Sequence, residues 1–146
     1  MSVEGKYNSN KQPLVSVAII TYNQKEFLCD CVDSILDQDY ENIEIVVADD
    51  GSSDGAQRLL ENYKCKYPDK FVLVLAEENR GVTKNSNAAH FACSGKYIAW
   101  MGGDDLMLPG KISAQVELME RCPETSLCYH DLDVFDSATG GSLGLF

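Results

Sequence analysis

The chain has 146 residues, of which 45% are hydrophobic and 24% charged, as expected for one globular domain. Its 23 acidic and 12 basic residues give a formal net charge of -11, which argues against nucleic acid or an anionic lipid surface as the main partner. A nucleotide ligand remains compatible with this charge, because a divalent cation can bridge protein carboxylates and a diphosphate.

Apolar segments of two kinds alternate along the chain. Short β-branched runs predict strands covered on both faces, and apolar stripes at helical spacing predict amphipathic helices between them. The predicted strands are 14–20, 43–48, 71–76, 97–101 and 125–129. The predicted helices are 27–36, a segment around 59–63, 82–93, and one that carries Leu108 to Met119 with Pro109 in its first turn. This order predicts right-handed crossovers and a three-layer, doubly wound, mainly parallel α/β sheet.

The domain organisation follows from these elements. We expect a flexible polar leader over residues 1–13, one domain over 14–136, and a turn-rich, poorly ordered tail over 137–146. Neither a signal peptide nor a membrane-spanning apolar run is visible, so the expected location is cytoplasmic, with peripheral attachment to the inner face of a membrane left open. The six cysteines form no C-x-x-C pair, which favours reduced, mostly buried thiols over a zinc site.

Polar side chains follow four of the predicted strands where each strand ends. In open parallel sheets, ligands bind at the carboxyl ends of the strands. The chain therefore predicts a binding site formed by Thr21-Tyr22-Asn23, Asp49-Asp50, Asn79-Arg80 and Asp104-Asp105.

Each of these groups has a chemical reading and a plain structural alternative. Asp104 and Asp105 suit a hard cation such as Mg²⁺ or Mn²⁺, which needs only one or two carboxylates plus substrate phosphates; alternatively they cap the next helix. Asp50 can accept a hydrogen bond from a pyrimidine imide, or belong only to a turn. Tyr22 can stack on a base or simply pack. Arg80 and Lys84 can contact phosphate or lie solvated at the surface.

A set of short segments follows one another in a specific order along the chain. They are the first strand with its Thr-Tyr-Asn end, Ser34-Ile35-Leu36-Asp37-Gln38, the stretch 45–54 with its Asp49-Asp50-Gly51-Ser52, Asn79-Arg80-Gly81, Asn87, Ser94-Gly95-Lys96-Tyr97-Ile98, and Gly103-Asp104-Asp105. In this order they resemble the motifs of the family 2 glycosyltransferases. Gly103-Asp104-Asp105 stands where that family has its D-x-D-type motif, with Gly103 in place of the first acid.

The resemblance implies a GT-A fold and transfer of a sugar, with inversion, from a nucleotide-sugar donor, usually a UDP-sugar, to a saccharide or lipid-linked hydroxyl. It implies that Thr21, Tyr22 and neighbouring residues line the nucleoside pocket and that Asp50 meets the uracil. Asp104 would lie near the ribose, and Asp105 would bind the divalent cation that holds the diphosphate. The family's catalytic base would fall beyond Phe146, so we expect a truncated enzyme that binds donor but is itself inactive. Surface polysaccharide or glycan biosynthesis is the expected setting.

Two other classes remain as alternatives. A nucleotidyltransferase of related architecture requires a Gly-rich basic loop after the first strand, where this chain has Tyr22-Asn23-Gln24. A receiver module with an acidic pocket requires its acidic pair after the first strand, where this chain has Thr21-Tyr22-Asn23.

Overall fold

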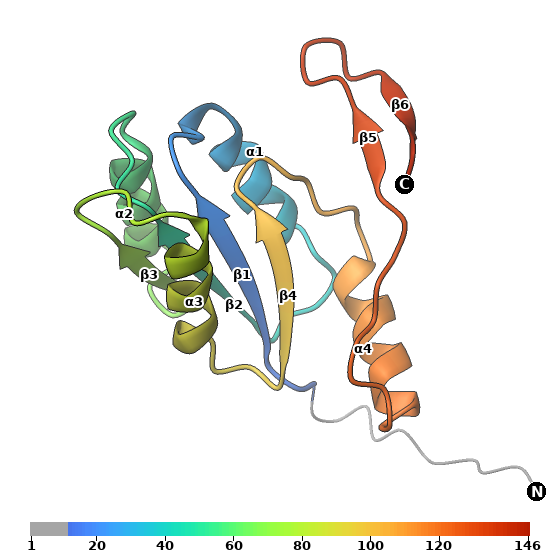
Figure 1. The fold of residues 1–146 in the computed structure, drawn as a ribbon. Helices are drawn as coiled ribbons and strands as arrows, with labels where there is room; N and C mark the ends of the chain where they lie inside the picture. Colours follow the sequence, from blue (N-terminus) through green and yellow to red (C-terminus); the bar gives the residue numbers. More distant parts are fainter. Residues whose placement is uncertain (1–11) are drawn as a thin grey trace, which may run out of the picture.

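The computed structural model describes residues 12–146, so the predicted leader lies outside the described residues except for Gln12 and Pro13. Strands and helices alternate as predicted through the first four strands (Figure 1). The elements are β1 (Val15–Thr21), α1 (Lys25–Leu36), β2 (Ile43–Asp49), α2 (Ala56–Lys66), β3 (Phe71–Leu75), α3 (Val82–Ala92), β4 (Tyr97–Gly102), α4 (Lys111–Arg121), β5 (Asp133–Phe135) and β6 (Ser142–Leu145).

Strands β1 to β4 form one parallel sheet in the order β3-β2-β1-β4. Strands β2 and β3 are therefore added on one side of β1, and β4 is added on its other side. The register pairs Thr21 with Asp49 and Ile20 with Gly102. The ends of β2, β1 and β4 thus lie next to one another at one edge, in that order.

The core lies on both faces of this sheet, which makes three layers. Alternate residues of β1 divide between the faces: Val17 and Ile19 join a large cluster with residues of α1, α2 and α4, whereas Ala18 packs with Ala48 and with Ala89 of α3. Small residues on this second face let α3 approach the strands closely, and in Figure 1 α3 lies on the opposite side of the sheet from α1. The predicted doubly wound α/β fold is confirmed.

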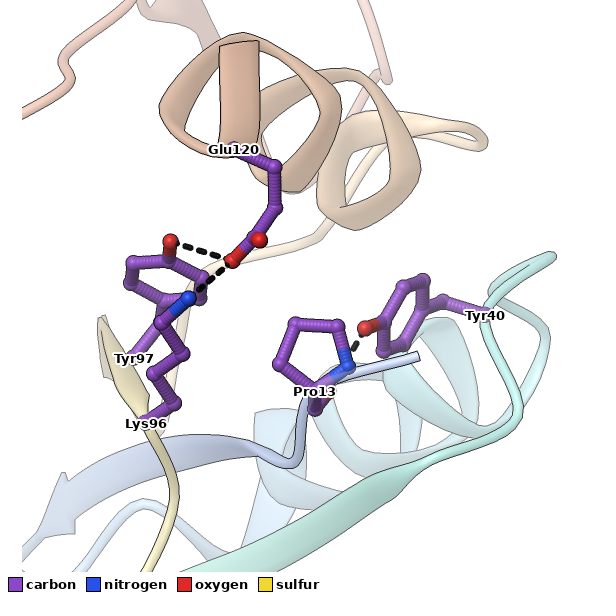
Figure 2. A network of polar contacts seen from close by, with 5 residues as sticks. All are labelled: Pro13, Tyr40, Lys96, Tyr97 and Glu120. Atoms are coloured by element: carbon purple, nitrogen blue, oxygen red, sulfur yellow. Dashed lines mark hydrogen bonds and ion pairs between the residues drawn. The ribbon is translucent and has the colours of Figure 1, made fainter. Parts of the chain in front are cut away.

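Helix α4 is joined to the edge strand by a polar contact far from the carboxyl edge. Glu120 Oε1 accepts hydrogen bonds from Tyr97 OH at 2.6 Å and from Lys96 Nζ at 2.5 Å, as Figure 2 shows. The same view shows Tyr40 OH donating to the Pro13 carbonyl at 2.6 Å, which fastens the chain before β1 to the segment before β2. Both contacts belong to the framework of the fold.

The prediction of a fifth strand at residues 125–129 is wrong. That segment has no regular structure, and its Leu127 and Tyr129 are 77% and 87% exposed. A strand needs a neighbour for its backbone groups, and this segment pairs with none of the described strands. The apolar residues that do pair come later.

Residues 137–146, which we expected to form a poorly ordered tail, contain a strand in this structure. Strand β6 lies inside that segment and pairs antiparallel with β5. Leu132 and Phe146 exchange two backbone hydrogen bonds, and Asp136 Oδ1 accepts from the backbone of Ala138 and Thr139 in the turn. A short turn closed by an aspartate brings the two apolar runs together locally.

Two smaller expectations concern the cysteines and the start of α4. None of the six cysteines forms a disulfide, and only Cys31 is buried, so the expectation of mostly buried thiols is wrong. Helix α4 begins at Lys111, so Leu108 and Pro109 precede it instead of lying in its first turn, because Gly110 adopts a left-handed conformation with φ 79° at the N-cap. No helix among residues 12–146 has the length and apolar character needed to cross a membrane.

Candidate functional site

The carboxyl ends of the parallel strands are connected by a polar framework centred on Asp49. This residue ends β2 and is fully buried. Its Oδ1 accepts from the backbone of Ser52 at 2.9 Å and from Gln57 Nε2 at 2.7 Å, and its Oδ2 accepts from Ser52 Oγ at 2.5 Å. Gln57 also donates to the carbonyl of Ala76 after β3. Asp49 therefore holds the loop after β2 and connects it to the end of β3.

Asp50, the predicted partner of the base, is 2% exposed and also shapes a loop. Its two carboxylate oxygens accept from the backbone N–H groups of Arg80 and Gly81, each at 2.9 Å. Each carboxylate oxygen has a second acceptor site, so the group retains capacity for a ligand donor. The loop contact is close: a side chain on Gly51 would come within 2.5 Å of the Glu78 backbone.

The loop after β1 is held against the loop after β2 through Asn23. Asn23 has a positive φ of 53°, which asparagine tolerates better than most residues. Its Oδ1 accepts from the backbone of Ser53, and its own N–H donates to Ser52 Oγ, both at 2.8 Å. Asp54 adds a second link by accepting from the backbone of Lys25 at 2.9 Å. The predicted nucleotide residue Asn23 thus has its side chain engaged in positioning these loops.

The carboxylates of Asp104 and Asp105 come together beside Gly102. A side chain on Gly102 would stand 2.9 Å from Asp104 Oδ1 and 3.0 Å from Asp105 Oδ2, so glycine is what leaves room for the pair. Asp105 Oδ2 accepts from the Gly102 N–H at 3.0 Å, which fixes its orientation. Behind them Cys31 donates to the Gly102 carbonyl at 3.5 Å. Burial, reinforced by the negative charges of Asp105 and Asp104, raises the pKa of Cys31 to about 12.

These residues fit a hard divalent cation completed by a substrate. Both aspartates are exposed, and one carboxylate oxygen of each lies close to Gly102. Among residues 12–146, no group of three or more His, Cys, Asp or Glu side chains could enclose a metal ion. A cation held by two carboxylates takes its remaining ligands from water and phosphate oxygens.

The other predicted residues are arranged around this edge with different exposures. Thr21 is buried, whereas Tyr22 is 47% exposed. Asn79, Arg80 and Lys84 are exposed on the loop after β3 and the first turn of α3. The structure thus brings the predicted residues to a common edge, with the buried ones building the loops and the exposed ones open to a ligand.

Sequence reasoning missed two residues at this edge. Asn85 of α3 is buried and donates through Nδ2 to the carbonyls of Ala48 at 2.9 Å and Thr21 at 3.4 Å. Lys111 lies at the start of α4; burial lowers its pKa, while the charges of Cys128 and Asp105 act in the opposite direction. Neither belongs to a recognisable motif, and only the fold brings each of them to the strand ends.

The sheet order, the carboxyl-edge framework and the acidic pair after β4 define a GT-A fold, the fold of many glycosyltransferases that use nucleotide sugars. Within that fold class the chain belongs to glycosyl transferase family 2, whose family model matches residues 16–139. This membership excludes the nucleotidyltransferase and receiver alternatives.

Curated relatives and solved structures agree with this membership. The chain is 33% identical over 127 residues to a putative glycosyltransferase, EpsE, of Bacillus subtilis. This alignment covers 87% of this chain and 46% of the relative. It is 35% identical over 111 residues to the putative teichuronic acid biosynthesis glycosyltransferase TuaG of the same organism, covering 76% of this chain and 44% of the relative. The chain thus spans less than half the length of these relatives.

Two solved structures share the fold. Mannosyltransferase PcManGT from Pyrobaculum calidifontis, in complex with GDP-Man and Mn²⁺, aligns with a TM-score of 0.69 and 27% identity over 75% of this chain and 33% of its own. S. aureus TarS 1-349 in complex with UDP-GlcNAc aligns with a TM-score of 0.66 and 25% identity over 74% of this chain and 31% of its own.

Proposed function

We propose that this chain binds the nucleotide-sugar donor of a glycosyltransferase that acts in surface polysaccharide or glycan biosynthesis. The observation that carries the proposal is the convergence of Tyr22, Asp50 and the Asp104-Asp105 pair at one edge of a parallel sheet. The names of the relatives, one of them a teichuronic acid enzyme, support the setting. The nucleotide sugars in the solved neighbours support the donor class.

The donor is a UDP-sugar in this proposal. The exposed ring of Tyr22 can stack on the base, and Asp50 offers an acceptor to the imide N–H of uracil. Cytosine presents an unprotonated nitrogen at the same position, which a carboxylate repels. The exposed side chains of Arg80 and Lys84 supply positive charge for phosphate oxygens.

Asp104 and Asp105 would hold a divalent cation, Mn²⁺ or Mg²⁺, against the diphosphate. When bound, the ion supplies Lewis-acid stabilisation for the departing UDP. Asp105 is oriented for this by the Gly102 N–H. The Asp104 carboxylate, like that of Asp105, lies beside Gly102. In this proposal Asp104 would also lie near the ribose of the donor.

In the transfer itself, a hydroxyl of a saccharide or lipid-linked acceptor attacks the anomeric carbon from the face opposite to UDP. The bond to the UDP oxygen breaks as the new glycosidic bond forms, so the configuration inverts. The hydroxyl proton passes to a carboxylate base, which we assign to none of the residues at this edge.

The proposal is tested by calorimetry of UDP, GDP and CDP, each in Mn²⁺ and in EDTA. We expect UDP to bind most tightly, and to bind more tightly in Mn²⁺. Tighter binding of GDP would contradict the assignment of the base but leave the donor class intact. A chain that binds no nucleoside diphosphate or nucleotide sugar under either condition would contradict the proposed function.

A further inference from the structure

The end of β1 lies between the two ligand-binding groups proposed above. In the sheet, β1 has β2 on one side and β4 on the other, and its last residues pair with Asp49 and Gly102. A nucleoside diphosphate carries its ribose between base and diphosphate. A ligand with its base at Asp50 and its diphosphate at the carboxylate pair therefore places its ribose over the residues that follow β1.

Gln24 stands at this place with its side-chain amide unused. It occupies the N-cap position of α1 but makes no side-chain capping hydrogen bond, and it is half-buried. Within residues 12–146, its amide has no hydrogen-bond partner, whereas the neighbouring side chains of Asn23 and Ser52 are both engaged. Its Oε1 lies 3.0 Å from the point where Gly103 would carry a Cβ.

Thr21 brings a second unpartnered polar group to the same point. Its Oγ1 lies 2.7 Å from that Cβ position, and the residue is 3% exposed. Its hydroxyl is buried without a hydrogen-bond partner among the described residues, which is uncommon in folded proteins. Thr21, Gln24 and Gly103 together form what we call the ribose notch: a buried hydroxyl without a partner among the described residues and an amide oxygen, both close to a glycine whose Cβ would clash with them.

We propose that Gln24 is a specificity-determining residue that binds a ribose hydroxyl of the nucleoside diphosphate. The inference rests on the proposed function and adds a residue to it. An amide both accepts through its oxygen and donates through its nitrogen, which suits the vicinal diol of a ribose better than a deoxyribose. Thr21 Oγ1 and Gln24 Oε1 both lie close to Gly103, which is itself buried and has no side chain to displace them.

The test is calorimetry in Mn²⁺ with UDP, 2′-deoxy-UDP and 3′-deoxy-UDP as probes. For the wild-type chain, we expect loss of the contacted hydroxyl to weaken binding about three- to tenfold, as for one neutral hydrogen bond. Gln24→Ala is expected to reduce the affinity for UDP by a similar factor. The variant should then bind UDP and the deoxy analogue that lacks the contacted hydroxyl with equal affinity. Because the Gln24 amide makes no hydrogen bond that the substitution would remove, the melting temperature of Gln24→Ala is expected to stay within about 2 °C of that of the wild type.

A matched control is Gln12→Ala, which removes an exposed amide that precedes β1 at the opposite edge of the sheet; it is expected to change neither affinity nor discrimination.

The outcomes separate this inference from the proposed function. If the wild-type chain binds UDP but Gln24→Ala leaves both affinity and discrimination unchanged, the role of Gln24 is refuted and donor binding stands. If the wild-type chain binds no nucleoside diphosphate, the proposed function fails and the inference fails with it.

Discussion

Replacing Asp50 by asparagine should reduce the preference for UDP over CDP and also loosen the loop after β3. The proposed hydrogen bond from the uracil imide to the Asp50 carboxylate would be worth about 1.5–3 kcal/mol. That corresponds to a preference of roughly tenfold or more. In Asp50→Asn the neutral amide can present either its oxygen or its NH₂ to the base, so we expect the preference to fall to about threefold or less.

The same substitution has a stability cost that the structure lets us estimate. Both carboxylate oxygens accept backbone hydrogen bonds, from Arg80 and Gly81. The asparagine amide has one oxygen, which can accept from only one of these two N–H groups, and its NH₂ would face the other N–H. One charge-assisted hydrogen bond of about 1.5–3 kcal/mol is therefore lost. For a domain of this size, we expect the melting temperature to fall by roughly 5–10 °C.

The UDP-to-CDP affinity ratio separates the two effects, because both ligands are measured on the same folded fraction. Asp49→Asn is the matched control: Asp49 is fully buried and accepts from Ser52 and Gln57, so it should lose stability without losing the ratio. The assay is isothermal calorimetry with thermal unfolding on each variant. Equal affinity of the wild-type chain for UDP and CDP would remove the recognition role from Asp50.

Three further substitutions test other parts of the site and fold. Asp105→Ala should weaken UDP binding far more in Mn²⁺ than in EDTA. If the wild-type chain binds UDP equally well in the two buffers, Asp104 and Asp105 have only a structural role in a turn and bind no metal ion. Tyr22→Ala should weaken UDP by the roughly 1–3 kcal/mol of an aromatic–base contact without changing thermal unfolding, and unchanged affinity in calorimetry would exclude stacking. Burial acts to raise the pKa of Glu44, but hydrogen bonds from Ser16 and Ser94 outweigh it and lower the pKa. Its stabilising contribution is therefore fully present above the usual pKa of glutamate and is lost as pH falls through the lowered pKa. Urea denaturation should show Glu44→Gln less stable than wild type at pH 7, with the difference shrinking as the pH is lowered into the acid range.

The sequence was sufficient to predict the parallel sheet because its signals are local and strong. The apolar runs of β1 and β2 alternate with amphipathic stripes, and each strand ends in residues that favour turns. The same reasoning failed after α4, where the run 125–129 has strand-forming residues but no described neighbour to pair with. Pairing in β5 and β6 depends on a turn closed by Asp136, and hydrophobicity alone did not indicate it.

The sequence predicted which residues meet at the carboxyl edge of the sheet, but not the different roles that they have there. The strand ends place Asp49, Asp50 and Asn23 at this edge, yet their side chains form hydrogen bonds between loops. Asn85 acts in the same way from α3, and only the folded arrangement shows that its side chain reaches two strand ends. A motif indicates which residues meet at an edge; it does not show whether their polar atoms face the ligand or the backbone.

This division explains which variants can separate binding from folding. The buried group, Asp49, Asp50 and Asn85, holds the loops through the hydrogen bonds of its side chains, so a substitution there changes the shape of the site and the free energy of unfolding together. The side chains of the exposed residues Tyr22 and Asp104 do not hold the loops in this way, so truncating either one should alter ligand affinity with little change in the free energy of unfolding. Binding losses at the buried positions therefore have to be judged as ratios between ligands, whereas losses at the exposed positions measure contact with the donor directly.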